Sequence, residues 1–118
     1  MMNAEKDLAA RTKLFARRVI RLFCALPKAT APQVLGKQVL RSGTSVGANY
    51  REANRARSKA EFIAKIGDCL KEADETLYWL ELLMEEGFVP AKRLQPLVKE
   101  ADELVAIFTT ISKRARGD

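Results

Sequence analysis

Apolar residues recur in alternating steps of three and four along four segments of this chain, and prolines or glycines mark two of the three breaks between the segments. Such steps keep side chains on one face of an α-helix, whereas a strand needs alternation at every second residue, which no stretch sustains. Pro27, Gly87 and Pro90 lie at the breaks, where these residue types commonly end or begin helices. The pattern therefore predicts four helices, at about 4–26, 32–56, 59–86 and 91–115.

Short connections between long helices place successive helices antiparallel. The chain has 118 residues, 47% of them apolar, which suits one globular domain. We therefore predict that residues 1–118 form a single all-α domain, an antiparallel up-down-up-down four-helix bundle. The expected core stripes are Leu8, Thr12, Phe15, Val19, Leu22 and Leu26; Leu35, Val39, Ser42, Val46, Asn49, Ala53 and Ala56; Ile63, Ile66, Leu70, Ala73, Leu77, Leu80 and Met84; and Leu94, Leu97, Ala101, Leu104, Phe108 and Ile111.

Candidate capping residues locate the first turns of the second and third helices. Thr30 is a candidate cap for the second helix, with Pro32 in the first turn, where its missing N–H costs nothing. The third helix opens with Ser58-Lys-Ala-Glu61, the spacing of a capping box in which the glutamate reaches back. Pro96 lies early in the fourth helix, so that helix starts either with an irregular first turn or at the proline itself.

The stretch RSGTSVGANYREANRARS, residues 41–58, contains two glycines but does not match a phosphate-binding loop. Such a loop needs glycines five apart followed by lysine, after a strand. Here Gly43 and Gly47 are four apart and share one helix face, where they let a neighbouring helix approach closely. Ser42 and Asn49 fall on the inward stripe and need buried hydrogen-bond partners. We interpret these four residues as a helix-packing motif.

Several large apolar residues remain outside the four core stripes. They lie on the first and third helices, and a second apolar face of this kind favours self-association. The alternative is a broad bundle core that leaves some apolar atoms exposed. The candidate oligomer-interface residues are Ile20, Phe23, Phe62, Tyr78, Trp79 and Leu83.

The chain has no histidine, which removes histidine-based hydrolase triads and zinc sites with imidazole ligands. Cys24 and Cys69 lack disulfide-scaffold or metal-site spacing, so we expect a reducing cytoplasm. The N-terminal stretch is charged and no long uncharged apolar run follows it, so we expect no secretory leader and no membrane span. We also expect no cofactor. Glu72 and Glu75, and Glu100 and Glu103, are similar to the magnesium-binding carboxylates of all-helical nucleotide pyrophosphohydrolases. In helical projection three of the four point outward and Glu100 flanks the core, so solvated acidic faces are favoured over a metal site.

Positive charge is concentrated in the first half of the chain. Residues 1–58 carry a net charge of +9, residues 59–90 carry −5 and residues 91–118 carry +2. Basic ridges contact phosphates without reading sequence, and no helix-turn-helix, zinc-finger or RNA-recognition motif accompanies them. The alternative is a solvated basic face that pairs with acidic residues of a neighbouring subunit. The candidate nucleic-acid-binding residues are Lys13, Arg17, Arg21, Lys28, Arg41, Arg51 and Arg55.

The segment VLRSGTSVGANYREANRARSKAEFIAKIGDCLKEADETLYWLELL resembles the four-helix bundle proteins encoded in bacterial 23S rRNA intervening sequences, also labelled S23 ribosomal proteins. The resemblance implies a bundle that assembles as a ring-like homo-oligomer of five subunits, without catalytic activity. It also implies kinship to the accessory subunit of diversity-generating retroelements, which is thought to bind nucleic acid. Ser45 and Glu52 join the packing motif by this resemblance, with Glu52 and Glu72 as polar partners for the small residues. The positions that match the family pattern are Ser45, Asn49, Glu52, Glu72, Glu75, Trp79 and Leu80.

Together these observations predict a cytoplasmic, non-enzymatic homopentamer that binds RNA or DNA without sequence preference. A second hypothesis is a structural or adaptor ring for a protein partner, in which basic side chains pair with Glu81, Glu85 or Glu86 across subunits. A third is a magnesium-dependent nucleotide pyrophosphohydrolase-like enzyme built on the paired carboxylates.

Overall fold

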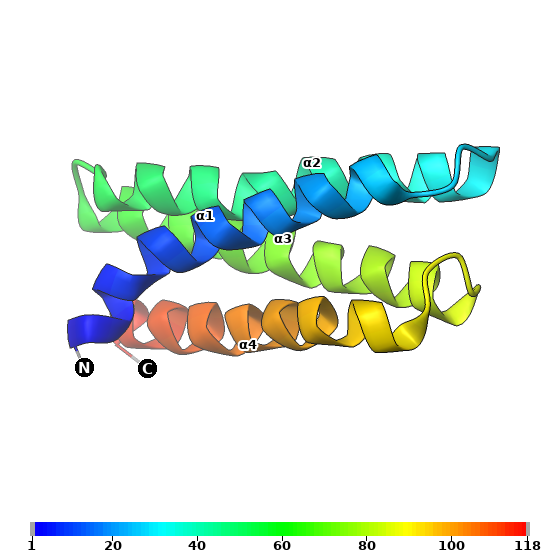
Figure 1. Cartoon of the computed structure of the whole chain (residues 1–118). Coiled ribbons are helices and arrows are strands. Elements are labelled where there is room, and N and C mark those ends of the chain that lie inside the picture. Colours follow the sequence, from blue (N-terminus) through cyan, green and yellow to red (C-terminus); the bar gives the residue numbers. More distant parts are fainter. Residues whose placement is uncertain (1, 118) are drawn as a thin grey trace.

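The computed structural model describes the backbone of residues 2–117 and the side chains of residues 8–117. It contains four helices, α1 (Met2–Ala25), α2 (Thr30–Asn54), α3 (Lys59–Glu85) and α4 (Ala91–Arg116). They run alternately up and down along a body of 45 × 22 × 22 Å, with both ends of the chain at the same end of the bundle (Figure 1). The predicted all-α four-helix bundle is confirmed, and each helix boundary lies within two residues of its expected position.

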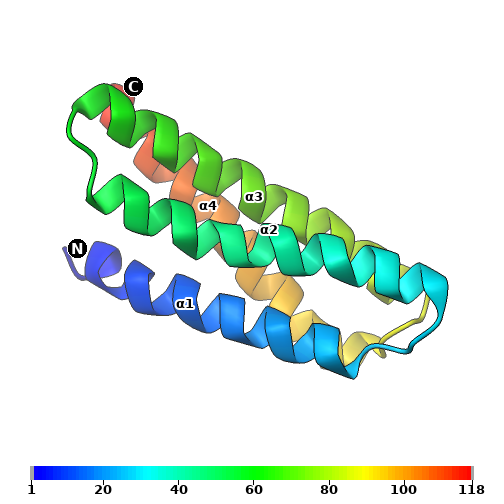
Figure 2. The same ribbon diagram turned by 90° about the horizontal axis from the view of Figure 1, so that it is seen from above.

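Each helix packs along the next one in the chain, but α1 and α4 approach each other only locally. Figure 1 shows that α1 is inclined to α4 and that the two helices are well separated at the end where α1 joins α2. In Figure 2, seen from above, they diverge instead toward the end that carries the termini. The bundle is therefore closed along three helix pairs and open along most of the fourth. We call this opening the α1–α4 seam.

The buried residues follow the expected stripes on α1, α2 and α4, with Leu22, Leu35, Asn49, Ala56 and Ile111 only half-buried. On α3 the fully buried row is rotated toward residues expected to flank the core, because α3 packs against both α2 and α4. Leu83 is 0% exposed and belongs to the chain's own core, so its proposed place on an oligomer interface is corrected. The buried row of α3 is Ile66, Cys69, Ala73, Thr76, Leu80 and Leu83.

Glycines allow α1 and α2 to pack closely. A Cβ atom on Gly43 would lie 2.8 Å from a methyl carbon of Val19, and one on Gly47 would lie 3.3 Å from the carbonyl oxygen of Thr12. Gly36, which sequence analysis did not single out, meets Leu26 even more closely, at 2.3 Å. The two helices approach closely at these positions because the glycines contribute no side chain to the contact.

The ends of the helices agree with the capping predictions in part. Ser58 caps α3 by accepting from the amide of Glu61 at 3.0 Å, while the Glu61 carboxylate accepts from the amide of Arg57 at 2.8 Å. Gly87 follows α3 with φ +75°, the left-handed conformation that glycine tolerates. The prediction for Thr30 is wrong: Ala29 holds the cap position without a side-chain bond, and Thr30 is the first helical residue.

Candidate nucleic-acid interface

Arg41, one of the predicted phosphate contacts, is held in an ion-pair cluster between α2 and α3. Its guanidinium lies 3.3 Å from an oxygen of Glu72 and also contacts the carboxylate of Glu75. Glu75 in turn accepts from the indole nitrogen of Trp79 at 3.3 Å. Two carboxylates already compensate this arginine, so Arg41 is the least available of the seven predicted cations.

Arg11 forms the equivalent cluster across the α1–α4 seam. Its guanidinium makes bonds of 2.7 and 2.9 Å to the two carboxylate oxygens of Glu100, and one of 2.6 Å to Glu103. The hydrogen bonding of the Arg11 guanidinium to the Glu100 carboxylate is the main reason that the pKa of Arg11 is raised above its ordinary value. This fork-shaped contact is the geometry for which arginine is suited.

Both carboxylate pairs that the sequence offered as a metal site therefore take part in ion pairs between helices. Glu72 and Glu75 face Arg41, whereas Glu100 and Glu103 face Arg11 on another helix. Among residues 8–117, no three His, Cys, Asp or Glu side chains gather in a group that could hold a metal ion. In the same part of the chain, no helix is long and apolar enough to span a bilayer.

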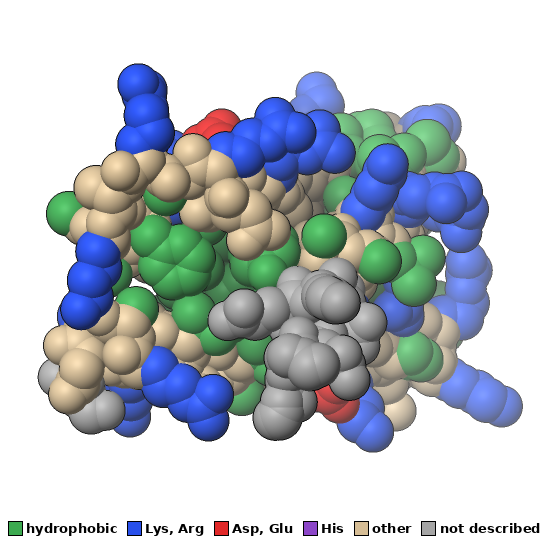
Figure 3. Space-filling model, turned by 90° about the vertical axis from the view of Figure 1, so that its left-hand side faces the viewer, with side chains coloured by type: hydrophobic (Ala, Val, Ile, Leu, Met, Phe, Trp, Pro, Cys, Tyr) green, Lys and Arg blue, Asp and Glu red, His purple; other side chains and the backbone are tan. Residues whose placement is uncertain are grey.

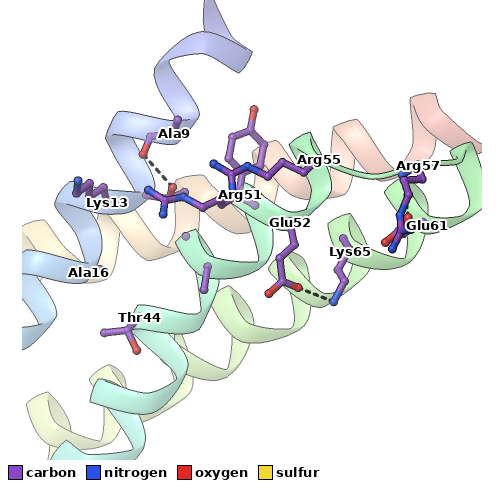
Figure 4. Close-up of a pocket in the computed structure, with 14 residues that line it drawn as sticks. Ala9, Lys13, Ala16, Thr44, Arg51, Glu52, Arg55, Arg57, Glu61 and Lys65 are labelled. Atoms are coloured by element: carbon purple, nitrogen blue, oxygen red, sulfur yellow. Dashed lines mark hydrogen bonds and ion pairs between the residues drawn. The ribbon is translucent and has the colours of Figure 1, made fainter.

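A groove of about 690 Å³ lies between α1, the second half of α2 and the start of α3, and we call it the α1–α2 groove. Its floor consists of small residues, because α1 and α2 meet there through Gly47. Cations and two carboxylates form its walls (Figure 4). The lining residues are Ala9, Thr12, Lys13, Ala16, Thr44, Gly47, Ala48, Tyr50, Arg51, Glu52, Arg55, Arg57, Glu61 and Lys65.

The two carboxylates of the groove are engaged, and most of its cations are not. Glu52 holds Lys65 at 2.6 Å, which raises the pKa of Lys65, and Glu61 accepts from the backbone of Arg57. Within residues 8–117, the side chains of Lys13, Arg51, Arg55 and Arg57 have no ion-pair partner. Figure 4 shows Arg51 extending from α2 toward α1, where Lys13 lies. The groove therefore carries uncompensated positive charge on both of its long walls.

The remaining predicted cations of α1 lie outside this groove. Arg17, Arg21 and Lys28 are exposed on the surface of α1 and the loop that follows it. Arg21 also lines a second cavity of about 190 Å³ in the α1–α4 seam, together with Arg18 and Arg93. The candidate interface thus divides into the α1–α2 groove and a basic ridge on α1, and Lys13 belongs to both.

The bundle end that carries both termini adds further positive charge. In Figure 3, Lys and Arg side chains project around the rim of this end, and hydrophobic side chains are visible between them. The last turn of α4 contributes Lys113, Arg114 and Arg116 to this end. The α1–α2 groove opens toward it, because α3 begins and α2 ends there.

Sequence analysis left Lys65 and Arg93 outside the candidate site. Each stands on a helix whose local charge gave no reason to select it, and only the packing of α3 on α2 and of α4 beside α1 brings it to a groove. For Lys65 the sequence did offer one signal. Glu52 and Lys65 carry opposite charges and lie thirteen residues apart, on either side of the short loop between two antiparallel helices, where two side chains can meet.

The polar members of the packing motif find their partners mainly in the backbone. Ser42 donates to the carbonyl oxygen of Gln38 at 2.8 Å, and its Oγ lies 2.7 Å from the buried hydroxyl of Thr76. Ser45 and Asn49 donate to carbonyl oxygens one turn earlier in α2. The side chains of Glu52 and Glu72 pair with Lys65 and Arg41, so the partner role expected for them does not extend to the small residues.

The candidate oligomer-interface residues differ in exposure. Ile20 and Tyr78 are 45% and 54% exposed, as expected for a surface that a partner could cover. Phe23, Phe62 and Trp79 are half-buried against the chain's own core. Leu14 and Val34 are also exposed, at 49% and 55%, although sequence analysis did not select them.

Comparisons with known proteins give one consistent result. A family model described as "23S rRNA-intervening sequence protein" matches residues 5–110. A crystal structure from Bacteroides thetaiotaomicron VPI-5482, described as a protein with unknown function from the S23 ribosomal protein family, is 38% identical. The match covers 92% of this chain and 97% of that one, with a TM-score of 0.85. No curated protein matches the chain.

Proposed function

Because this chain belongs to the 23S rRNA-intervening sequence protein family, we propose that it acts as a non-enzymatic, cytoplasmic homopentamer that binds RNA or DNA. Binding takes place through basic side chains that contact phosphates and do not read the base sequence. The two unpaired thiols, Cys24 and Cys69, suit a reducing compartment.

The observation that carries this proposal is the number of exposed cations on α1 and α2 that lack ion-pair partners. Six of the seven predicted cations are exposed and unpaired among residues 8–117, and only Arg41 is compensated. A chain with a net charge of +6 has enough acidic residues to pair more of them, yet its described ion pairs involve only Arg11, Arg41 and Lys65. Free cations on adjacent helices form an electrostatic footprint for a polyanion.

Self-association rests on a separate observation. Ile20, Leu14, Val34 and Tyr78 each expose about half of their side-chain surface. Exposed apolar residues on several helices favour burial against further copies of the chain. Native mass spectrometry tests this part of the proposal, and a monomer at micromolar concentration would contradict it.

One observation favours a structural or adaptor ring for a protein partner as the second candidate. Glu85 and Glu86 are exposed at the end of α3 and have no ion-pair partner among the described side chains. In that function these acids pair with the basic ridge of a neighbouring subunit, which leaves little free positive surface. A lack of affinity for nucleic acid in an intact oligomer would favour this candidate.

The test of nucleic-acid binding is a filter-binding titration of structured RNA and of DNA at several salt concentrations. We expect log K to fall linearly with log salt, with a slope of about −0.9 per neutralised phosphate on duplexes. Replacing Arg17 and Arg21 together with glutamate should weaken binding to all sequences alike. The matched control is Lys92→Glu with Lys99→Glu, which makes the same change of net charge at exposed positions of α4 in place of α1. Equal losses in the two double variants would remove the α1 ridge from the interface.

A further inference from the structure

We propose that the α1–α2 groove is a binding site for the sugar–phosphate backbone of single-stranded nucleic acid. This inference rests on the proposed function and narrows it to one site and one form of the ligand. It joins three features of the groove: unpaired cations on two facing walls, a floor of small residues, and the lack of a free hydroxyl or aromatic group that could identify a base.

The first feature is the placement of like charges. Lys13 stands on α1, and Arg51 and Arg55 stand on α2, so the groove between the helices is lined by cations from both sides. Like charges that lie near one another repel unless an anion is placed between them. A phosphodiester chain supplies such anions at regular intervals, which suits a groove with cations along both walls better than a single bound ion does.

The second feature is the shape of the groove. The floor of the groove is formed by small side chains, which leave space above them, and at Gly47 the backbone of α2 lies close to the backbone of α1. The small residues are Ala9, Ala16, Thr44 and Ala48. The groove's volume of about 690 Å³ is that of a site for a small organic ligand. This volume accommodates a short stretch of one backbone strand but not the body of a duplex.

The third feature is the lack of groups that could identify a base. Thr44 donates to the carbonyl oxygen of Leu40, and Tyr50 is only 3% exposed, so it offers no face for stacking. The free polar groups of the groove are therefore mainly flexible cations, which contact phosphates without the fixed hydroxyl or aromatic contacts that would select a base. Binding here is expected to be independent of sequence and strongly dependent on salt.

A substitution at Glu52 tests the proposal through an increase in affinity for single strands. Its carboxylate lies at the groove edge, is 57% exposed and holds Lys65. Glu52→Gln removes a charge that repels phosphate and also frees Lys65 for the ligand. We expect this variant to bind single strands about five- to tenfold more tightly, and Asp74→Asn, with the same charge change at an exposed position farther along α3, to bind about as the wild type does.

The experiment measures fluorescence anisotropy of labelled oligouridine of about 12 nucleotides, a length within the usual range of single-strand sites. A duplex of the same length and ATP serve as competitors. The groove variant is Arg51→Gln with Arg55→Gln, and the ridge control is Arg17→Gln with Lys28→Gln. Circular dichroism establishes that each variant remains helical.

The expected result is a loss of about tenfold or more in single-strand affinity for the groove variant, against about threefold or less for the ridge control. For the groove variant, the slope of log K against log salt concentration should become shallower by about 1.4, because two phosphate contacts are lost and each contributes about 0.7 on a single strand. Equal losses in the two variants, or equal competition by the duplex, would overturn the groove site while leaving the proposed function intact. Competition by ATP at nucleotide concentrations equal to the oligomer would show a site for free nucleotides and overturn the strand assignment. A wild-type protein that binds no nucleic acid at low salt would overturn both proposals.

Discussion

Val19 of α1 packs directly on the backbone of Gly43 in α2, and a Cβ atom added to Gly43 would lie 2.8 Å from one methyl carbon of Val19 and 3.0 Å from the other. The valine side chain is branched at Cβ and has one strongly preferred rotamer in a helix, so it cannot turn away. The distance between α1 and α2 is therefore set by the absence of a single side chain.

Gly43→Ala should destabilise the bundle, although alanine is the better helix former. Overpacking against Val19 costs about 1–3 kcal/mol, and the gain in helix propensity returns about 1 kcal/mol, so we expect a net loss of up to about 2 kcal/mol. Gly67→Ala is the matched control on α3, where an added Cβ meets nothing within 4 Å, and it should stabilise by about 0.5–1 kcal/mol. Urea unfolding of the two variants measures both values. A stabilised Gly43→Ala variant would show that α1 yields easily at this contact.

Arg11 is the main polar connection across the α1–α4 seam, and its loss should loosen the first half of α1. Arg11→Met keeps the apolar stem but leaves Glu100 and Glu103 facing each other without a cation, at a cost of about 1–2 kcal/mol. Lys65→Met removes a more exposed ion pair and should change stability little. Hydrogen exchange should rise in α1 for the Arg11 variant, whereas uniform exchange across α1 to α4 would argue against a local role.

Ser58 should contribute measurably to stability as the cap of α3. Ser58→Ala removes the acceptor of the Glu61 amide and should cost about 1 kcal/mol in thermal or urea unfolding. Ser45→Ala is the control, because Ser45 bonds only to a carbonyl oxygen of its own helix and alanine is favoured there. Equal effects of the two substitutions would contradict the capping role.

The two cysteines should differ sharply in reactivity. Cys24 is exposed, while Cys69 is buried and donates to the carbonyl oxygen of Val46, and burial raises the pKa of Cys69 to about 12. Since the thiolate is the reactive form, alkylation of the native protein at pH 8 should modify one thiol per chain, and denaturation should expose the second. Mass spectrometry of the products checks this, and two adducts forming at the same rate would contradict the burial of Cys69.

The same pKa shift makes stability depend on pH at the alkaline end. Because the folded pKa of Cys69 lies above that of the unfolded thiol, its contribution is complete below about pH 8.5 and declines as pH rises toward 12. The unfolding free energy of the wild type should therefore fall more between pH 8 and pH 10 than that of Cys69→Ala. Parallel pH profiles would argue against the shift.

Much of the fold can be predicted from local pattern. The stripe of α1 with Phe15 and Val19, the Ser58 cap and the Gly87 stop all depend on residues within a turn or two of one another, where propensity and periodicity act directly. The Thr30 cap was wrong because the last residue before a helix is decided by the path of the loop, and that loop places Ala29 there.

The candidate site is less predictable, because charge on a helix face does not reveal what stands opposite. Arg41 and Arg51 are both exposed cations of α2, separated by ten residues. Packing of α3 brings Glu72 and Glu75 to the first, while no described carboxylate pairs with the second. The difference between a structural arginine and a free one depends on contacts between helices, which periodicity does not encode.

The sequence by itself determined four antiparallel helices, their inward stripes, the basic character of α1 and α2 and the resemblance to the family, because helical periodicity, capping and charge are properties of neighbouring residues. The tertiary structure decided which cations remain free, that Leu83 is core, and that small residues between α1 and α2 leave a basic groove. Those outcomes depend on the crossing and spacing of helices far apart in the chain, where one missing side chain at Gly43 or Gly47 sets how closely two backbones meet.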